Sequence, residues 1–158
     1  MLAFPLEQWA IYCLLSGILA ALLMNIPMYV QPDGYRPAYV AAAGLTGIDP
    51  SEASDALAVA VHHVTGTAAA LLYGAVVFAL GAVLPTLVDL NGIPAIPHLA
   101  GAVTVTVFIY YFFERIALPR AGGSFRADAE QIVQQWALSA FIYGTTLALL
   151  LPVIVTQL

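Results

Sequence analysis

The stretch from Leu57 to Leu84, LAVAVHHVTGTAAALLYGAVVFALGAVL, decides the fold. It holds no Asp, Glu, Lys or Arg, and it exceeds the roughly 20 apolar residues with which a helix crosses a bilayer. Three more apolar stretches of comparable length occur at 6–30, 99–118 and 136–155. The pattern predicts four membrane-spanning segments.

The composition of the whole chain agrees with this prediction. Of its 158 residues, 62% are hydrophobic and 8% are charged, which leaves too little polar surface for a water-soluble domain. Inside a bilayer every backbone N–H and C=O must be paired, and a helix pairs them within its own segment. We therefore predict an all-α, integral membrane four-helix bundle, built as one domain over 1–158 and located in the cell membrane.

The four arginines indicate an orientation. Arg36 lies in the first connection between predicted spans, and Arg115, Arg120 and Arg126 lie at or in the third. Because basic loops stay on the cytoplasmic side, we expect these connections inside and both chain ends outside. The chain does not open with the basic region of a signal peptide, so 6–30 is expected to be a retained span.

The charge balance narrows the classes of function. A net charge of −5 without any lysine is typical of proteins from salt-loving archaea, although a GC-rich genome would also deplete lysine. Nucleic-acid binding is not expected, because it needs a basic surface. The single Cys13 lies in the first span, so no disulfide framework is present, and we expect this residue to pack as a small group.

Capping signals place the ends of the longer helices. Asp49-Pro50-Ser51-Glu52 is typical of a helix start. A second helix running from there to Leu84 would be about 52 Å long and would overhang the membrane into the cytoplasm. The fourth helix is expected to overhang as well, since the polar residues 128–135 follow a break at 122–124. The residues 37–48 are expected to form a short helix along the cytoplasmic surface.

Counting residues along each predicted span gives the depth of its side chains in the membrane. This places polar side chains from all four helices at the predicted cytoplasmic boundary. Polar groups at membrane depth indicate a functional site, whereas snorkelling side chains and helix ends at the interface explain such residues without any ligand. Both interpretations stay open. The candidate cofactor-binding layer consists of Asn25, His62, His63, Glu114, Arg115 and Gln135.

The histidines limit the metal chemistry that we expect. His62 and His63 point about 100° apart on a helix, so one faces the bundle and the other faces lipid or a partner. His98 begins the third span on the opposite side, which argues against a haem held by two histidines. Met24 and Met28 with His63 would suit a haem with His/Met ligation or Cu(I). The sequence requires no cofactor.

Small and polar faces predict how the helices pack. Gly66, Thr67, Ala70 and Gly74 on the second span, and Gly17, Ala20 and Ala21 on the first, favour close helix contact. A polar stripe on the fourth span must point away from lipid, either for interhelical hydrogen bonds or along an ion path. Its residues are Gln135, Ser139, Tyr143 and Thr146.

The first two spans also carry short patterns that allow a comparison. They are Gly17-Ile-Leu-Ala-Ala-Leu-Leu-Met24 followed by Pro27, then His63-Val-Thr-Gly66 and Tyr73-Gly74. In these residues the first half of the chain resembles a loose group of uncharacterised small four-span membrane proteins of archaea and bacteria. The resemblance implies no activity, and only a packing unit of His63, Gly66 and Tyr73-Gly74.

Catalytic signatures such as a Ser-His-Asp set, a phosphate loop or HExxH do not occur, and an enzyme is the least expected class. We predict an accessory or structural subunit that packs against itself or other membrane chains. The alternative is a protein that handles a cofactor, quinone or ion in the cytoplasmic polar layer. The expected partners are the lipid bilayer and a homo- or hetero-oligomeric membrane partner.

Overall fold

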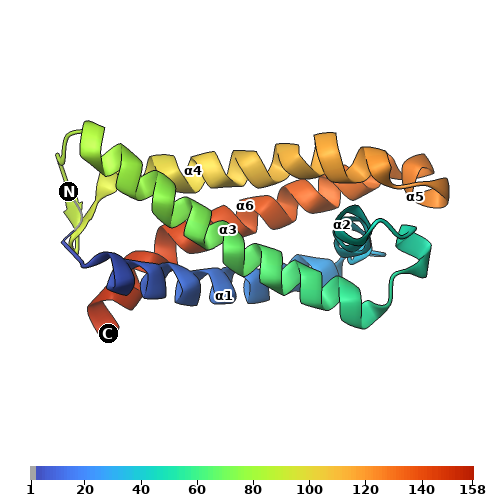
Figure 1. Cartoon of the computed structure of the whole chain (residues 1–158), viewed down its shortest axis with the longest axis horizontal. Helices are drawn as coiled ribbons and strands as arrows, with labels where there is room; N and C mark the ends of the chain where they lie inside the picture. The colour runs from blue at the N-terminus through green and yellow to red at the C-terminus, as the bar shows by residue number, and fades with distance from the viewer. Residues whose placement is uncertain (1–2) are drawn as a thin grey trace.

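A computed structural model describes residues 3–158, except for the side chains of residues 123 and 124. Four long helices form an antiparallel bundle (Figure 1), and each is long and apolar enough to cross a membrane. They are α1 (Leu6–Val30), α3 (Asp55–Val83), the helical run Ala95–Arg120 and α6 (Ala129–Gln157). The predicted all-helical fold with four apolar spans is confirmed.

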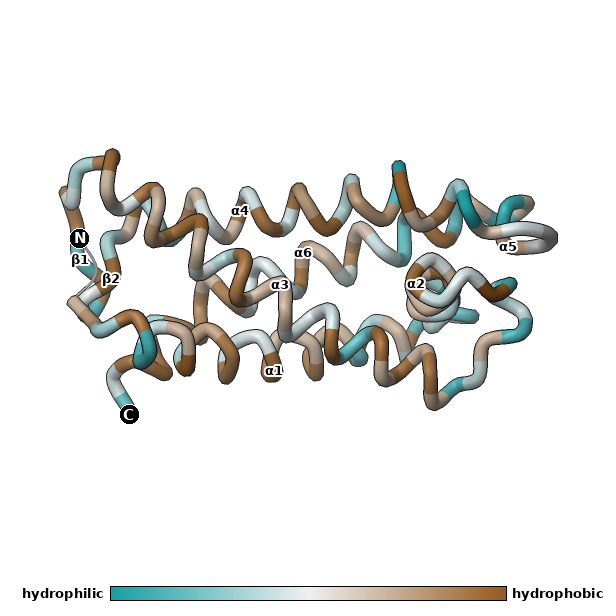
Figure 2. Tube along the Cα trace, viewed as in Figure 1, coloured by the Kyte–Doolittle hydropathy of each residue, from teal (hydrophilic) through white to brown (hydrophobic). Residues whose placement is uncertain are grey.

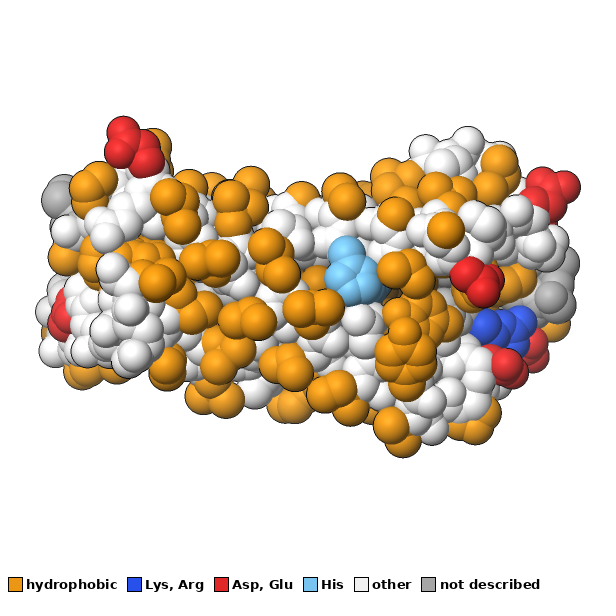
Figure 3. Space-filling view, turned by 90° about the horizontal axis from the view of Figure 1, so that it is seen from below, with side chains coloured by type: hydrophobic (Ala, Val, Ile, Leu, Met, Phe, Trp, Pro, Cys, Tyr) orange, Lys and Arg blue, Asp and Glu red, His pale blue; other side chains and the backbone are white. Residues whose placement is uncertain are grey.

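Apolar residues cover the length of these helices, as the hydropathy colouring in Figure 2 shows. On the face shown in Figure 3, acidic and basic side chains gather at the two ends, and the middle is apolar apart from one histidine. This is the surface of a multi-pass membrane protein, because a bilayer accepts charge only at its two interfaces.

The helices pack in a square. α1 packs mainly against α3 and α6, and α4 (Ala95–Phe112) packs against the same two helices. At the α1–α3 contact a Cβ on Gly17 would lie 2.5 Å from Cβ of Ala70, and one on Gly74 would lie 2.7 Å from Sγ of Cys13. The predicted small-residue contact between the first two spans is therefore confirmed, with Cys13 as part of it.

The short helix α2 (Arg36–Thr46) lies across the end of the bundle, and Figure 1 shows it nearly end-on. Its bounds agree with the helix predicted for 37–48. Gly47, with φ of 77°, ends it in the left-handed conformation that glycine adopts without strain. Ala38, Val40 and Ala42 are fully buried, so α2 closes this end of the bundle against α3, α6 and the third helical run.

The second helix was predicted to begin near Pro50, which was wrong by five residues, because α3 begins at Asp55. Asp49 does cap a helical turn, because its Oδ1 accepts a hydrogen bond of 2.9 Å from the Ser51 N–H. That turn is a separate 3₁₀ helix, η1 (Pro50–Glu52). Ser54 then caps α3, its Oγ accepting from the Leu57 N–H at 3.2 Å. With 29 residues, α3 is about 43 Å long and still exceeds the hydrocarbon thickness.

The third helical run is irregular where it approaches α2. After α4 the backbone widens into a π-helical segment, η2 (Phe113–Ala117), and then tightens into the 3₁₀ turn η3 (Leu118–Arg120). Trp136 of α6 donates its Nε1–H to the carbonyl of Ile109, in the last turn of α4, at 3.0 Å. A short helix, α5 (Gly123–Ala127), then leads into α6.

A two-stranded hairpin at the other end was not predicted. β1 (Asp89–Leu90) pairs antiparallel with β2 (Ile93–Pro94). Asn91 and Gly92 form its turn with φ of 57° and 90°, as Asn-Gly commonly does in tight hairpins. The third span consequently begins at Ala95, earlier than position 99.

Candidate functional site

His62 and His63 point in different directions from α3. The rings are 5.0 Å apart between centroids and nearly perpendicular. His62 is buried, with 4% of its surface exposed, whereas His63 is half-buried. His62 faces the bundle, and His63 lies at its edge in contact with Asn25 of α1.

Both nitrogens of His63 are used. Its Nδ1 lies 2.9 Å from the Val59 carbonyl oxygen, which only accepts, so Nδ1 carries the proton. The unprotonated Nε2 accepts from Nδ2 of Asn25 at 3.1 Å, and Oδ1 of Asn25 accepts from the Tyr35 hydroxyl at 2.7 Å. This leaves His63 without a free nitrogen for the Met24 and Met28 metal site considered above.

His62 has the opposite tautomer. Its Nε2 lies 3.2 Å from the carbonyl oxygen of Ala21 on α1 and must donate to it. The remaining Nδ1 is then an unprotonated acceptor. Within residues 3–158 this Nδ1 has no hydrogen-bond partner, and the imidazole forms part of a cavity wall.

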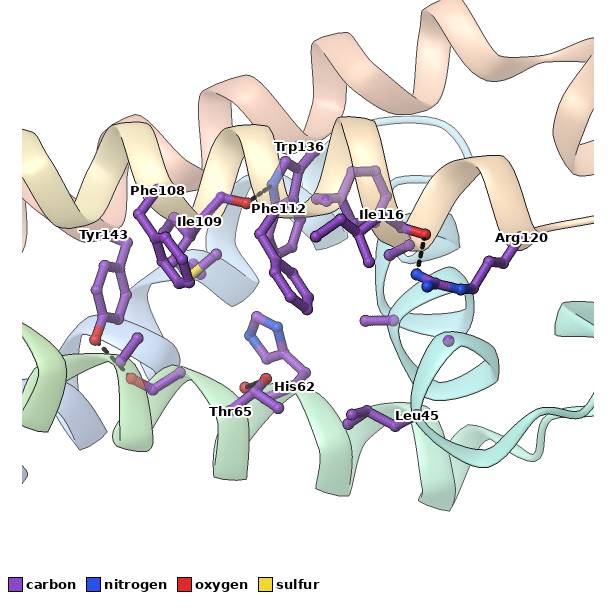
Figure 4. Close-up of a pocket in the computed structure, with 17 residues that line it drawn as sticks. Leu45, His62, Thr65, Phe108, Ile109, Phe112, Ile116, Arg120, Trp136 and Tyr143 are labelled. Atoms are coloured by element: carbon purple, nitrogen blue, oxygen red, sulfur yellow. Dashed lines mark hydrogen bonds between the residues drawn. The ribbon is translucent and has the colours of Figure 1, made fainter.

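The cavity has a volume of about 200 Å³ and lies between α3 and the third helical run (Figure 4). α2 closes one end with Ala41, Gly44 and Leu45, and α6 forms the back with Trp136 and Tyr143. Phe108 and Phe112 line the cavity while 48% and 44% of their surfaces are exposed on the outside of the bundle. The wall between α3 and α4 therefore reaches the face that would meet lipid.

The widened backbone of η2 shapes this cavity. Phe113, Ile116 and Ala117, all within the π-helical segment, contribute to the wall. Phe113 stacks on Trp136 with ring centroids 4.5 Å apart, which fixes the back of the cavity. A π-helical segment inside an α-helix often marks a functional site.

Arg120 is the one charged residue among the described residues that line the cavity. Its Nη1 donates to the Ile116 carbonyl at 2.6 Å, and Figure 4 places its side chain beside the α2 end. Since a guanidinium has five N–H donors, most of them remain available at the rim. In the sequence, Arg120 indicated only the orientation of the chain, and its place in the cavity wall was not predicted.

The predicted polar layer is only partly assembled. Asn25 and His63 are in contact, and His62 is next to them. Gln135 instead donates from Nε2 to the Pro32 carbonyl at 2.8 Å. Glu114 and Arg115 pair with each other at 3.5 Å, with 73% of the Arg115 side chain exposed, and neither lines the cavity.

Other buried polar groups connect helices to one another. Trp9 donates to the Gly74 carbonyl at 3.0 Å, and Tyr143 donates to the Gly66 carbonyl at 2.6 Å. The predicted stripe on the fourth span is buried throughout, at Gln135, Ser139, Tyr143 and Thr146. The bonds of Trp9 and Tyr143 join different helices, whereas Ser139 donates within α6 to the Gln135 carbonyl, and the buried Oε1 of Gln135 has no partner among the described residues.

Tyrosines near α2 are held in the protonated form. Burial, followed by the neighbouring Tyr29, raises the pKa of Tyr35 to about 12. The hydrogen bond from Tyr39 to Asp55, 2.6 Å long, raises the pKa of Tyr39. Both hydroxyls therefore act as donors at neutral pH.

The site thus combines apolar walls, one unpaired acceptor and one cation at the rim, an arrangement that suits a molecule with a polar group and an apolar chain. Comparison of the chain with known protein families, curated proteins and solved structures found no match.

Proposed function

We propose that the protein binds one amphipathic molecule from the surrounding cell membrane in the cavity between α3 and α4. A hydroxyl of this molecule donates to Nδ1 of His62, and its apolar chain lies against Phe108 and Phe112. The observation that carries the proposal is an unpaired ring nitrogen, on a buried residue, in the wall of an apolar cavity.

A hydrogen bond to His62 and contacts with the apolar walls both favour binding of such a molecule in the cavity. Nδ1 of His62 is not among the fully enclosed unpaired side-chain atoms of the described residues, which are Ser16 Oγ and Gln135 Oε1. It is therefore accessible to a donor from the ligand, and such a hydrogen bond contributes about 0.5–1.5 kcal/mol. The apolar chain leaves lipid for an apolar cavity, so it gains contacts with Phe108 and Phe112 but little hydrophobic free energy. A lipid-soluble molecule of the quinol or glyceride type provides both groups. Ion handling gains less support, because no carboxylate is among the described residues that line the cavity.

The test uses Trp136 as a reporter inside the cavity. In a Trp9→Phe background Trp136 is the only tryptophan, and a monoacylglycerol with a brominated chain, added to protein in nanodiscs, will quench its fluorescence on binding. We expect saturable quenching that Ala69→Phe abolishes by filling the cavity. Ala68→Phe is the matched control, because Ala68 is exposed on the outside of α3.

A variant of the histidine tests the polar contact. His62→Leu removes the acceptor and is expected to weaken monoacylglycerol binding by about tenfold, whereas His63→Leu should leave it unchanged. Quenching that never saturates, or that Ala68→Phe and Ala69→Phe affect equally, would mean that the reporter sees only bulk lipid and would refute the proposal.

We also propose an accessory-subunit role as the second candidate, supported by a groove on the outside of α4 and α6. The groove measures about 220 Å³ and has small residues at its base, among them Ala102, Gly144 and Ala148. Small residues let a foreign helix approach closely in a membrane. Affinity purification from native membranes tests this role, and Thr145→Leu, which fills the groove, should release a stoichiometric partner. Recovery of self-associated protein alone would rule out a hetero-complex.

A further inference from the structure

Figure 4 shows the groups of the cavity in a definite order along its length. Arg120 and Leu45 lie at the α2 end, His62 faces Phe112 in the middle, and Phe108 and Tyr143 lie at the far end. From Phe108 to Arg120 the third helical run covers twelve residues, or about 18 Å at helical rise. A bound molecule would therefore meet a cation, then an acceptor, then apolar walls.

Arg120 is the one arginine among the described residues in the wall of the cavity. Among the described residues, Arg36 pairs with Asp128 at 2.7 Å and Arg115 pairs with Glu114. Arg120 contacts a backbone carbonyl of its own helix and no carboxylate within 4 Å in the described part of the chain. Arg126 also has no carboxylate partner within 4 Å in the described part of the chain and bonds the Pro119 carbonyl, but it does not line the cavity. An anion at the rim would be held by Arg120 itself.

We propose that the ligand is an anionic, single-chain lipid in which a phosphate headgroup is followed by a free hydroxyl and then one apolar chain. The phosphate binds the guanidinium of Arg120, the hydroxyl donates to Nδ1 of His62, and the chain extends past Phe108. One chain suits a cavity of about 200 Å³. This inference rests on the proposed binding function and adds the chemical class of its ligand.

Arginine matches the geometry that this assignment needs. A guanidinium donates two parallel hydrogen bonds to phosphate oxygens, and Arg120 lies at the α2 end of the cavity, away from Phe108 and Tyr143. A carboxylate in the cavity would oppose an anion, and among the described lining residues none is present. The Trp136 N–H already donates to the Ile109 carbonyl, so it is not available as a second donor to the phosphate.

The experiment compares three probes in nanodiscs of zwitterionic lipid, again read by Trp136 fluorescence in the Trp9→Phe background. The probes are a monoacylglycerol phosphate and a monoacylglycerol, both with the same brominated chain, and free glycerol phosphate as a competitor. We expect the phosphate lipid to bind at least about tenfold more tightly than the neutral lipid. Free glycerol phosphate should not displace it, because a molecule without an apolar chain does not concentrate in the membrane beside the cavity.

Arg120→Gln should reduce binding of the phosphate lipid to the level of the neutral lipid and leave the neutral lipid unaffected. Arg126→Gln is the matched control, since Arg126 also bonds to a backbone carbonyl, that of Pro119, and does not line the cavity. Equal binding of both lipids by the unsubstituted protein would overturn the headgroup assignment and leave the binding function standing. Displacement by free glycerol phosphate would show that the site recognises phosphate without a lipid chain, which also overturns the assignment. Absence of saturable binding by either lipid would overturn both.

Discussion

Tyr73 of α3 donates its hydroxyl hydrogen to Nδ1 of His98 on α4. The same histidine donates from Nε2 to the carbonyl oxygen of Ala148 on α6 at 2.9 Å. One buried imidazole thus ties three of the four long helices together. His98 has both nitrogens satisfied, in contrast to His62, and this difference separates a structural histidine from a candidate binding residue.

Tyr73→Phe should destabilise the bundle without affecting the cavity. The substitution leaves Nδ1 of His98 without its donor in an apolar surrounding, which we expect to cost about 1–2 kcal/mol. Thermal unfolding in detergent measures the loss as a lower Tm. Tyr111→Phe is the control, because Tyr111 lies exposed on the outside of α4. An equal Tm for the two variants would show that the Tyr73–His98 contact contributes nothing to stability.

Gly17→Ala and Gly81→Ala should have opposite effects on stability. A Cβ at Gly17 would lie 2.5 Å from Cβ of Ala70 and 3.2 Å from the Thr67 carbonyl oxygen, so α1 and α3 must separate. We expect a loss of about 1–3 kcal/mol. A Cβ at Gly81 meets nothing within 4 Å, and alanine there should stabilise α3 by up to about 1 kcal/mol. Chemical unfolding in mixed micelles compares the two, and a destabilising Gly81→Ala would contradict this account.

The four spans and the α1–α3 contact could be predicted because both depend on short-range patterns. Apolar length identifies a span, and glycines at helical spacing identify a face that a neighbour can approach. The start of α3 could not be placed by the same reasoning, because two capping signals follow each other at Asp49 and Ser54. The hairpin had a usable signal, Asn91-Gly92, between segments too short to be recognised as strands.

The cavity could not be predicted, because it depends on long-range packing. A depth count assumes regular helical geometry, and the π-helical turn at Phe113–Ala117 changes which side chains face the bundle after it. Glu114 and Arg115 lie within this turn and outside the cavity wall, whereas Arg120 follows it and lies at the rim. The position of α2 across the bundle depends on contacts with helices far away in the sequence.

Asp128→Asn should loosen the attachment of α2 to the opposite side of the bundle. Arg36 pairs with Asp128 at 2.7 Å, and its guanidinium lies 4.8 Å above the Phe125 ring. The pair is partly exposed, so we expect a loss of about 0.5–1 kcal/mol. Hydrogen exchange of the α2 amides provides a local measurement. Faster exchange in α2 with an unchanged rate in α1 is the expected result, and a uniform increase in both helices would argue against a local role.

Alkaline pH should weaken the contacts around Tyr35. Its hydroxyl donates to Asn25, and burial followed by the neighbouring Tyr29 raises its pKa to about 12 in the folded protein, above the value of about 10 for an exposed tyrosine. Because the folded pKa is the higher one, the protonated form stabilises the fold. That contribution is complete below about pH 10 and disappears as the pH approaches about 12. Unfolding measured across this range should show a decline that Tyr35→Phe makes shallower and Tyr111→Phe leaves unchanged. A Tyr35→Phe protein with the same decline as the unsubstituted protein would show that other groups cause it.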